Sequence, residues 1–225
     1  MTVEAFAKLF DHTQLKAYAS RADFEKLCDE GVRCGFMMLA VNPAAVEFCK
    51  RRVEKSGVRV GAAVGFPLGQ NTLEAKIFET EDAIKKGADE IDYVINVAEL
   101  KNKNTDYIKR EMFFIVSVCR QHNVTSKVIF ENCYLTDDEK ITLCGIANEV
   151  RPDFIKTSTG FGTGGATAAD VALMRRYADP GIKIKAAGGI KTLADVDALL
   201  AAGAVRIGTS SSVAIMGGFM GGNKI

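Results

Sequence analysis

Apolar and polar positions along the chain follow two alternating patterns. Short runs that are apolar almost throughout, such as Phe36–Val41, are typical of strands buried on both faces. Longer segments with apolar residues at helical spacing follow them, such as Pro43–Gly57, which has a proline near its first turn and a closing glycine. The chain is therefore expected to alternate strands with helices.

The alternation predicts eight strand–helix units. The chain opens with a helix-like or edge segment over Val3–Phe10, and the helix over Arg21–Glu30 is expected to end at Gly31. Strands are predicted over Lys8–Thr13, Phe36–Val41, Val58–Val64, Glu90–Val97, Ser126–Glu131, Phe154–Ser158, Ile182–Ala187 and Val205–Gly208. The other helices are predicted over Pro43–Gly57, Thr72–Lys86, Asp106–His122, Thr167–Tyr177 and Thr192–Ala202, after the capping box Thr136-Asp-Asp-Glu139, and from Ser210.

Strands that alternate with helices favour a parallel sheet with right-handed crossovers. Eight units within 225 residues fit an α/β fold, the (β/α)8 or TIM barrel, if the loops are short. An open doubly wound sheet is the alternative, but the GxGxxG turn usual after its first strand is missing. Because no linker or low-complexity segment interrupts the pattern, residues 1–225 are predicted to be a single barrel domain with an N-terminal helical extension.

The charge balance excludes partners that recognise a strong overall charge. Lysine and arginine number 29 against 28 aspartates and glutamates, so no net field attracts nucleic acid. No apolar run approaches the ~20 residues of a membrane span, and charged residues interrupt the start of the chain where a signal peptide has its apolar core. Six cysteines without metal-ligand spacing are typical of reduced thiols, so the protein is expected in the cytoplasm.

The stretch Asp153-Phe-Ile-Lys-Thr-Ser-Thr-Gly160 carries a lysine within a predicted strand. Lys156 shares one face of that strand with Phe154 and Ser158, and a glycine-rich loop able to bend around a small ligand follows. Burial disfavours the ammonium form of a lysine, and the neutral amine is a nucleophile towards carbonyl groups. The alternative is a lysine at a strand end whose amine lies in water.

Chemistry in such a barrel is expected at the carboxyl ends of the strands. Lys185 follows Lys156 by 29 residues, about one strand–helix–strand repeat, so the two are expected on adjacent strands, where one cation lowers the pKa of the other. Asp92 lies near the end of another predicted strand and is a further candidate for the site. The alternative is that it only forms a structural ion pair with Lys127 or Lys185. Glu131 ends the same predicted strand as Lys127, and its alternative role is a structural pairing with Lys127. The remaining polar residues at strand ends include Asp11, Thr13, Asn96, Ser158 and Thr159.

Glycines also mark the ends of the last two predicted strands. They belong to Ala187-Gly188-Gly189 and to Gly208-Thr-Ser-Ser211. In many barrels this corner binds phosphate through backbone N–H groups and a helix N-terminus. The alternative is a pair of tight turns with helix caps, but glycines at both loops favour phosphate.

Together these motifs resemble the deoxyribose-phosphate aldolase family. The resemblance covers essentially the whole chain in order, and its most specific parts are the KTSTG and K-x-A-G-G motifs. The matching segments are Asp11-His-Thr13 with Lys16, Val41-Asn-Pro43, Gly65-Phe-Pro-Leu-Gly69, Gly87–Asp92, Val94-Ile-Asn96, Lys127-Val-Ile129, Asp153–Gly160, Lys185–Gly189 and Arg206–Ser211.

The resemblance implies a class I aldolase without metal or cofactor that reversibly cleaves 2-deoxy-D-ribose 5-phosphate to D-glyceraldehyde 3-phosphate and acetaldehyde. By position, it implies that Lys156 forms the Schiff base, that Lys185 lowers the pKa of that lysine and exchanges protons, and that Asp92 is an acid/base group. It further implies a homo-oligomer, a dimer or larger. The supporting residues are Asp11, Thr13 and Lys127, and the substrate and phosphate contacts are Thr159, Gly188, Gly189, Gly208, Ser210 and Ser211.

Three departures from the family pattern limit this transfer. Ala40 stands where many members have a cysteine, so no thiol role transfers to it. Phe161 follows KTSTG where some members have a lysine, which leaves the phosphate to backbone and hydroxyl groups. The tail Met220–Ile225 lacks the terminal tyrosine of some longer members, so no proton-transfer role is expected there.

Two other functions stay open on the sequence alone. Another Schiff-base barrel aldolase, such as a transaldolase-like enzyme, would use a dihydroxyacetone unit as the donor in place of acetaldehyde. A non-catalytic sugar-phosphate binder would form no covalent adduct on Lys156.

Overall fold

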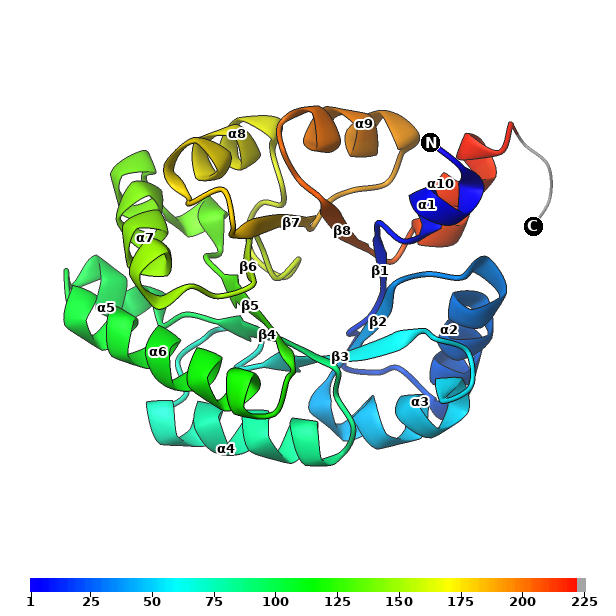
Figure 1. Cartoon of the computed structure of the whole chain (residues 1–225), viewed down its shortest axis with the longest axis horizontal. Coiled ribbons are helices and arrows are strands. Elements are labelled where there is room, and N and C mark those ends of the chain that lie inside the picture. The colour runs from blue at the N-terminus through cyan, green and yellow to red at the C-terminus, as the bar shows by residue number, and fades with distance from the viewer. Residues whose placement is uncertain (222–225) are drawn as a thin grey trace.

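A closed parallel barrel forms the centre of the protein (Figure 1). The computed structural model describes residues 1–221. Their strands are β1 (Phe10–Gln14), β2 (Met38–Val41), β3 (Arg59–Val64), β4 (Glu90–Val94), β5 (Thr125–Ile129), β6 (Phe154–Lys156), β7 (Lys183–Ala187) and β8 (Arg206–Thr209). Each strand pairs in parallel with the next, and β8 pairs with β1 to close the ring, which confirms the predicted (β/α)8 barrel.

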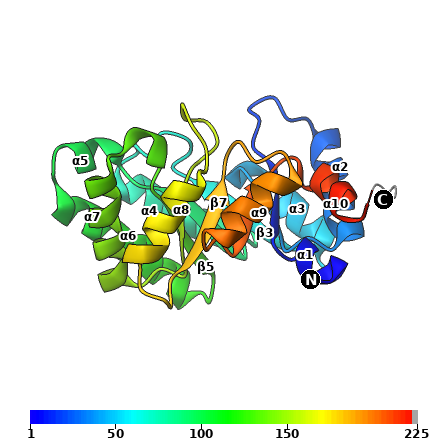
Figure 2. The ribbon, with the colours of Figure 1, turned by 90° about the horizontal axis from the view of Figure 1, so that it is seen from above.

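The helices surround this barrel, and the loops after β1 and β6 project to one side of it (Figures 1 and 2). The α-helices are α1 (Val3–Ala7), α2 (Arg21–Cys34), α3 (Val46–Val53), α4 (Leu73–Lys85), α5 (Val97–Lys101), α6 (Thr105–Gln121), α7 (Asp137–Val150), α8 (Ala168–Tyr177), α9 (Leu193–Ala201) and α10 (Ser212–Phe219). Short 3-10 turns are η1 (Pro43–Ala45) and η2 (Asn132–Tyr134). No helix within residues 1–221 is long and apolar enough to cross a membrane.

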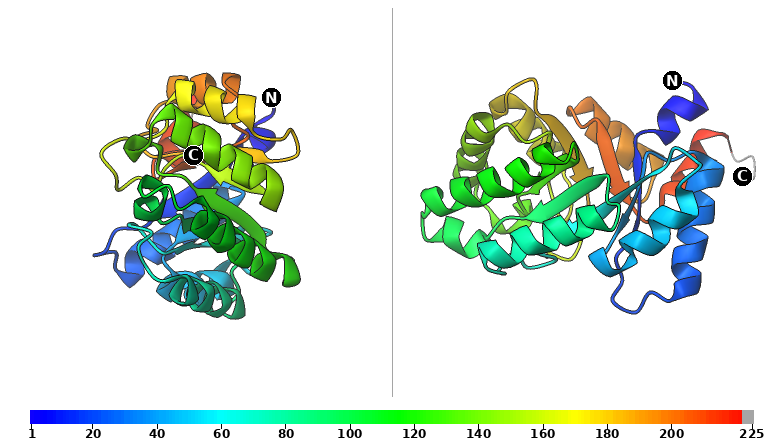
Figure 3. Two further views of the ribbon diagram at one scale, coloured as in Figure 1. Left: turned by 90° about the vertical axis from the view of Figure 1, so that its left-hand side faces the viewer. Right: turned by 60° about the horizontal axis from the view of Figure 1, so that its bottom comes forward.

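The N-terminal extension is the short helix α1, which lies beside α10 (Figures 1 and 3). Phe6 of α1 stacks on Phe219 of α10 with ring centroids 4.0 Å apart, so the two ends of the described chain pack together. Residues 222–225, most of the tail Met220–Ile225 to which the sequence gives no proton-transfer role, lie outside the described residues.

One predicted helix end is wrong. The helix that begins at Arg21 does not end at Gly31 but continues to Cys34, where Gly35 adopts the left-handed conformation with φ +67°. Gly31 is buried within α2, and a Cβ at this position would lie 2.5 Å from the side chain of Leu39. This glycine therefore allows close packing of α2 on β2 and does not terminate the helix.

Some strand ends also differ from the prediction. β4 stops before the predicted Val97, because Asn96 leaves the strand and caps α5 with its side chain. β6 stops before the predicted Ser158, although that residue is still buried. The last helix begins at Ser212 and not at Ser210. Asn96, Ser158 and Ser210 therefore lie in loops that follow the carboxyl ends of their strands.

The apolar core lies between the sheet and the helices. Ile91 and Tyr93 of β4 face outward into this core, as alternation along a strand requires. Glu90 and Asp92 of the same strand are also buried, but they contact charged side chains of other strands. The interior of the barrel is therefore a buried polar layer.

Candidate active site

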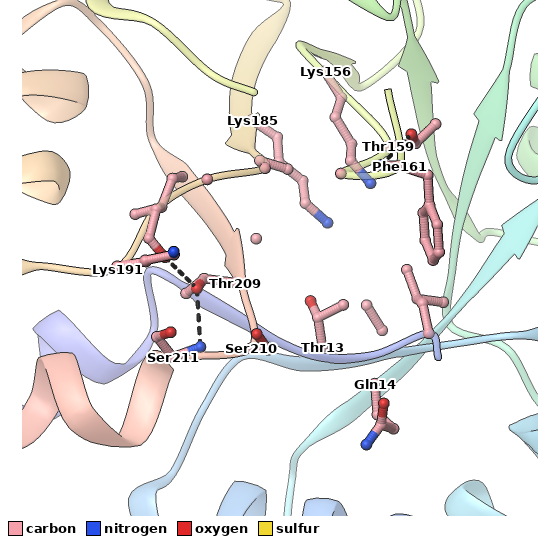
Figure 4. A pocket seen from close by; sticks show the side chains of 18 of the residues that line it. Thr13, Gln14, Lys156, Thr159, Phe161, Lys185, Lys191, Thr209, Ser210 and Ser211 are labelled. Atoms are coloured by element: carbon pink, nitrogen blue, oxygen red, sulfur yellow. Dashed lines mark hydrogen bonds between the residues drawn. The ribbon is translucent and has the colours of Figure 1, made fainter. Parts of the chain in front are cut away.

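A pocket of about 300 Å³ opens at the carboxyl ends of β1, β6, β7 and β8 (Figure 4). Of the predicted supporting and catalytic residues, Asp11, Asp92 and Lys127 lie deeper in the barrel and do not line it. The predicted residues that line the pocket are Thr13, Lys156, Thr159, Lys185, Gly188, Gly189, Gly208, Ser210 and Ser211.

Lys156 and Lys185 meet at one carboxylate. Their backbones are paired in the register of β6 and β7, which confirms the adjacency predicted from their spacing. Both Nζ atoms donate hydrogen bonds to Oδ2 of Asp92, each at 2.7 Å. Figure 4 shows the two amines pointing into the same space. Because Lys156 is only 4% exposed, its alternative interpretation as a strand-end lysine in water is wrong.

The environment of Lys156 favours its neutral amine. Burial lowers the pKa of Lys156 to about 8, against the opposing effect of the Asp92 carboxylate and with the help of the Lys185 ammonium. At pH 7 about one tenth of such a lysine is neutral, whereas about three in ten thousand molecules of an unperturbed lysine are. A buried nucleophile is therefore available near neutral pH.

Asp92 remains ionised in the same surroundings. Burial raises the pKa of this carboxyl, but the ammonium groups of Lys127, Lys156 and Lys185 outweigh burial and hold the pKa well below its usual range. Lys127 donates to Oδ1 at 2.5 Å, opposite the oxygen that the other two lysines share. The predicted structural ion pairs with Lys127 and Lys185 thus both exist, and Asp92 contacts Lys156 as well. An ionised carboxylate in this place can accept protons.

A second tier of charged groups supports this cluster. Asp11 contacts Nζ of Lys185 and accepts a hydrogen bond from Arg206 at 2.7 Å. Glu90 lies 2.6 Å from Nζ of Lys127 and 3.4 Å from Arg206. Sequence reasoning did not include Glu90 or Arg206 in the site, although the parity of β4 places Glu90 on the inner face.

Glu131 is a partner of Thr159, and its alternative role as a structural partner of Lys127 is wrong. It accepts hydrogen bonds from the hydroxyl of Thr159 and, at 3.1 Å, from its backbone N–H. Glu131 has a positive φ of +58° just beyond β5, which turns its side chain towards the loop after β6. Burial raises the pKa of Glu131. No signal in the sequence announces this backbone turn.

Thr13 supports the site through the backbone. Its hydroxyl donates to the carbonyl oxygen of Asp11 at 2.9 Å, while its side chain lines the pocket. Phe66, which sequence reasoning left out of the site, lies with its ring centroid 5.4 Å from Nζ of Lys156 and contacts Phe161 edge to face. An aromatic wall thus borders the lysine on the side of the loop after β3.

The predicted phosphate corner is built from closely packed glycine loops. Gly188 has φ +89°, and a Cβ there would lie 3.1 Å from the Cα of Gly165. Gly208 lies within β8, where a Cβ would meet Cε of Lys185 at 3.0 Å, so this glycine makes room for the lysine. Ser210 and Ser211 lie beside the pocket near the start of α10 (Figure 4). The corner is open to a ligand that binds backbone and hydroxyl groups.

Known proteins are similar in sequence to this chain along nearly its whole length. A family model described as DeoC/LacD family aldolase matches residues 5–223. The deoxyribose-phosphate aldolase of Bacteroides thetaiotaomicron is 56% identical over 216 residues, which are 96% of this chain and 91% of that protein. The deoxyribose-phosphate aldolase of Lactobacillus acidophilus is 53% identical over 214 residues, 95% of this chain and 90% of that protein.

Solved structures agree with these matches. The deoxyribose phosphate aldolase from Aeropyrum pernix, described as a unique tetrameric structure, superposes with a TM-score of 0.91 and 31% identity over 97% of this chain and 92% of that chain. The resemblance inferred from the motifs is therefore confirmed, and this chain belongs to the DeoC/LacD family of aldolases.

Proposed function

We propose that this protein is a deoxyribose-phosphate aldolase that reversibly cleaves 2-deoxy-D-ribose 5-phosphate to D-glyceraldehyde 3-phosphate and acetaldehyde. The observation that carries the proposal is the buried Lys156 amine, held against an ionised Asp92 and a second lysine at the floor of a pocket. The family and the relatives named deoxyribose-phosphate aldolase support this substrate over a dihydroxyacetone donor.

The reaction needs only an amine and a proton relay. The Lys156 amine adds to the C1 aldehyde of the open-chain sugar, and loss of water leaves a protonated imine. The electron pair of the C2–C3 bond moves into this imine as the C3 hydroxyl loses its proton, which releases glyceraldehyde 3-phosphate and leaves an enamine. Protonation of the enamine at C2 and addition of water then release acetaldehyde and regenerate the amine.

Asp92 and Lys185 are the groups placed to move these protons. As an ionised carboxylate in contact with Lys156, Asp92 accepts a proton during carbinolamine formation or from the C3 hydroxyl. Lys185 donates to the same oxygen of Asp92. A proton that Lys185 gives to the substrate is therefore replaced by one that Asp92 has accepted. Asp11, Thr13 and Lys127 support this relay. The substrate hydroxyls and phosphate are assigned to Thr159, Gly188, Gly189, Gly208, Ser210 and Ser211.

Borohydride trapping tests this function and its site together. The protein is incubated with acetaldehyde, reduced, digested and mapped by mass spectrometry, and a two-carbon adduct is expected on Lys156. Lys156→Ala is expected to lose both adduct and cleavage. Lys183→Ala is the matched control, because Lys183 belongs to the same barrel but is exposed at the start of β7. An adduct on another lysine would overturn the assignment of Lys156. If the folded protein binds the sugar phosphate but forms no adduct, the result would favour a non-catalytic binding protein.

The protein's organisation is also part of the proposal. We propose that residues 1–225 form one domain that works in the cytoplasm, where the six free cysteines stay reduced. We further propose a homo-oligomer of two or more copies. The description of the Aeropyrum pernix relative as tetrameric supports an assembly, and light scattering of the purified protein measures its mass.

A further inference from the structure

A set of charged side chains fills the barrel below Lys156, and we call it the charge ladder. None of its members is more than 6% exposed. Three are carboxylates and three are cations, so the ladder is neutral without Lys156. Its members are Asp11, Glu90, Asp92, Lys127, Lys185 and Arg206.

The lysines of the barrel differ in how many of these carboxylates they contact. Lys127 lies within 4 Å of three, namely Asp92 at 2.5 Å, Glu90 at 2.6 Å and Asp11 at 3.9 Å. Lys185 contacts two, the carboxylates of Asp11 and Asp92. Lys156 contacts one, Asp92, and shares that oxygen with Lys185.

A buried cation without a carboxylate of its own is costly, so the group that loses its proton is the one with the fewest partners. In this barrel that group is Lys156, because arginine stays charged and the other two lysines have more carboxylates. Glu90 and Arg206 start β4 and β8, two residues before the level of Asp92 and Gly208, and neither lines the pocket.

We propose that Glu90 and Arg206 are positioning residues that set the protonation of Lys156 through the charge balance of the ladder, with Arg206 favouring the neutral amine and Glu90 opposing it. The inference rests on the proposed Schiff-base function of Lys156. Other charges near the ladder are few among the described residues. Arg59 of β3 contacts Glu90 at 3.1 Å but is half in water, and Lys183 of β7 lies over the ring of Phe154, as Arg206 does, but is exposed. The carboxylate of Glu131 has a minor electrostatic interaction with Lys156, and β2 contributes only apolar residues.

Changing one charge of the ladder has an effect of predictable sign. Glu90→Gln leaves the ladder with one excess positive charge, which disfavours the Lys156 ammonium and moves the titration of the amine to lower pH. Arg206→Met leaves one excess negative charge, which the Lys156 ammonium neutralises, so the titration moves to higher pH. Each shift is expected to be roughly one pH unit, which is the effect of a unit charge about 12 Å away at an effective dielectric constant of about 20.

The double variant Glu90→Gln/Arg206→Met is again neutral, and its titration is expected to return towards that of the wild type. A purely structural role for the two residues predicts loss of folded protein or of kcat, but no opposite shifts and no cancellation. Arg206→Lys keeps the charge and is expected to keep the wild-type titration. Arg59→Met is the matched control, because its guanidinium is half exposed and screened by water.

The experiment is the pH dependence of acetylation by acetic anhydride, followed at the Lys156 peptide by mass spectrometry with exposed Lys55 as the internal reference. This labelling needs no aldolase activity, so its midpoint tests the ladder even if the wild type fails to cleave deoxyribose phosphate. Opposite shifts in the two single variants, cancelled in the double, are the expected result. Unshifted midpoints in folded variants would overturn the proposal. If Glu90→Gln does not fold, a coincident midpoint in Arg206→Met and Arg206→Lys would overturn it.

Discussion

Replacing Lys185 by methionine tests whether the neighbouring ammonium keeps Lys156 nucleophilic. The Nζ atoms of both lysines lie 2.7 Å from Oδ2 of Asp92, so they are at most about twice that distance, 5.4 Å, apart. At this separation two unit positive charges repel by about 3 kcal/mol at an effective dielectric constant of 20. That energy corresponds to about two units in the pKa of Lys156.

Removing this repulsion raises the pKa of Lys156 from its value of about 8, since the amine then has Asp92 to itself. The neutral fraction of Lys156 at pH 7 is expected to fall about 100-fold. The sign follows from the chemistry of the step: the amine attacks only when deprotonated, so the acid limb of the pH–rate profile marks its titration.

The assay is kcat/KM for cleavage of 2-deoxyribose 5-phosphate, measured from about pH 6 to pH 10 by the release of glyceraldehyde 3-phosphate. Lys185→Met is expected to move the acid limb upward by about two pH units and to lower the plateau, because a proton donor is also lost. Lys183→Met, on the same strand but exposed, controls for changes in β7 and is expected to shift nothing. An unshifted acid limb in Lys185→Met would show that burial alone sets the reactivity of Lys156.

Three further predictions follow from the geometry of the site. Glu131→Gln is expected to raise KM with little change in kcat, because Thr159 loses charge-assisted hydrogen bonds of about 1.5–3 kcal/mol; steady-state kinetics that show a fall in kcat alone would contradict this role. Gly188→Ala is expected to raise KM for the phosphorylated sugar more than for 2-deoxyribose, since its Cβ, at φ +89°, would press on Gly165; equal effects on the two sugars would place the phosphate elsewhere. Asp92 has a pKa below that of an unfolded aspartate despite its burial, so the stability it contributes is present above about pH 4 and is lost as the pH falls further. Urea unfolding is accordingly expected to separate wild type from Asp92→Asn widely at pH 6 and less at pH 3, and a constant difference would refute this linkage.

The barrel could be predicted from the sequence because each strand–helix unit carries its own local signal. Apolar runs and helical spacing depend on neighbours in the chain, and the 29-residue interval between Lys156 and Lys185 was enough to place them on adjacent strands. The failure at Gly31 has a different cause. A glycine that ends a helix and one that admits a neighbouring side chain look alike in sequence, and only the position of Leu39 decides between them.

Most contacts between distant strands could not be predicted, although the pairing of Asp92 with Lys127 or Lys185 was. Parity along β4 places Glu90 and Asp92 on one face, but it does not say which cation from another strand lies opposite. Arg206 reaches Asp11 across the closing pair of the barrel, 195 residues away in sequence. The partner of Glu131 depends on one positive φ, a backbone choice that its neighbours in sequence do not signal.

The location of the apolar core explains how this barrel tolerates so much buried charge. The outward-facing positions of the strands, such as Ile91 and Ile155, pack with the helices, so the hydrophobic layer is complete without the interior. Barrel interiors are usually filled with branched apolar side chains, and here Lys127 and Asp92 replace them. Such pairs offset their own desolvation at best, and removing one partner leaves an uncompensated buried charge. The interior therefore contributes little net stability. It is instead the part of the fold that sets the charge on Lys156, because each charged side chain around that lysine is held in place by its own strand.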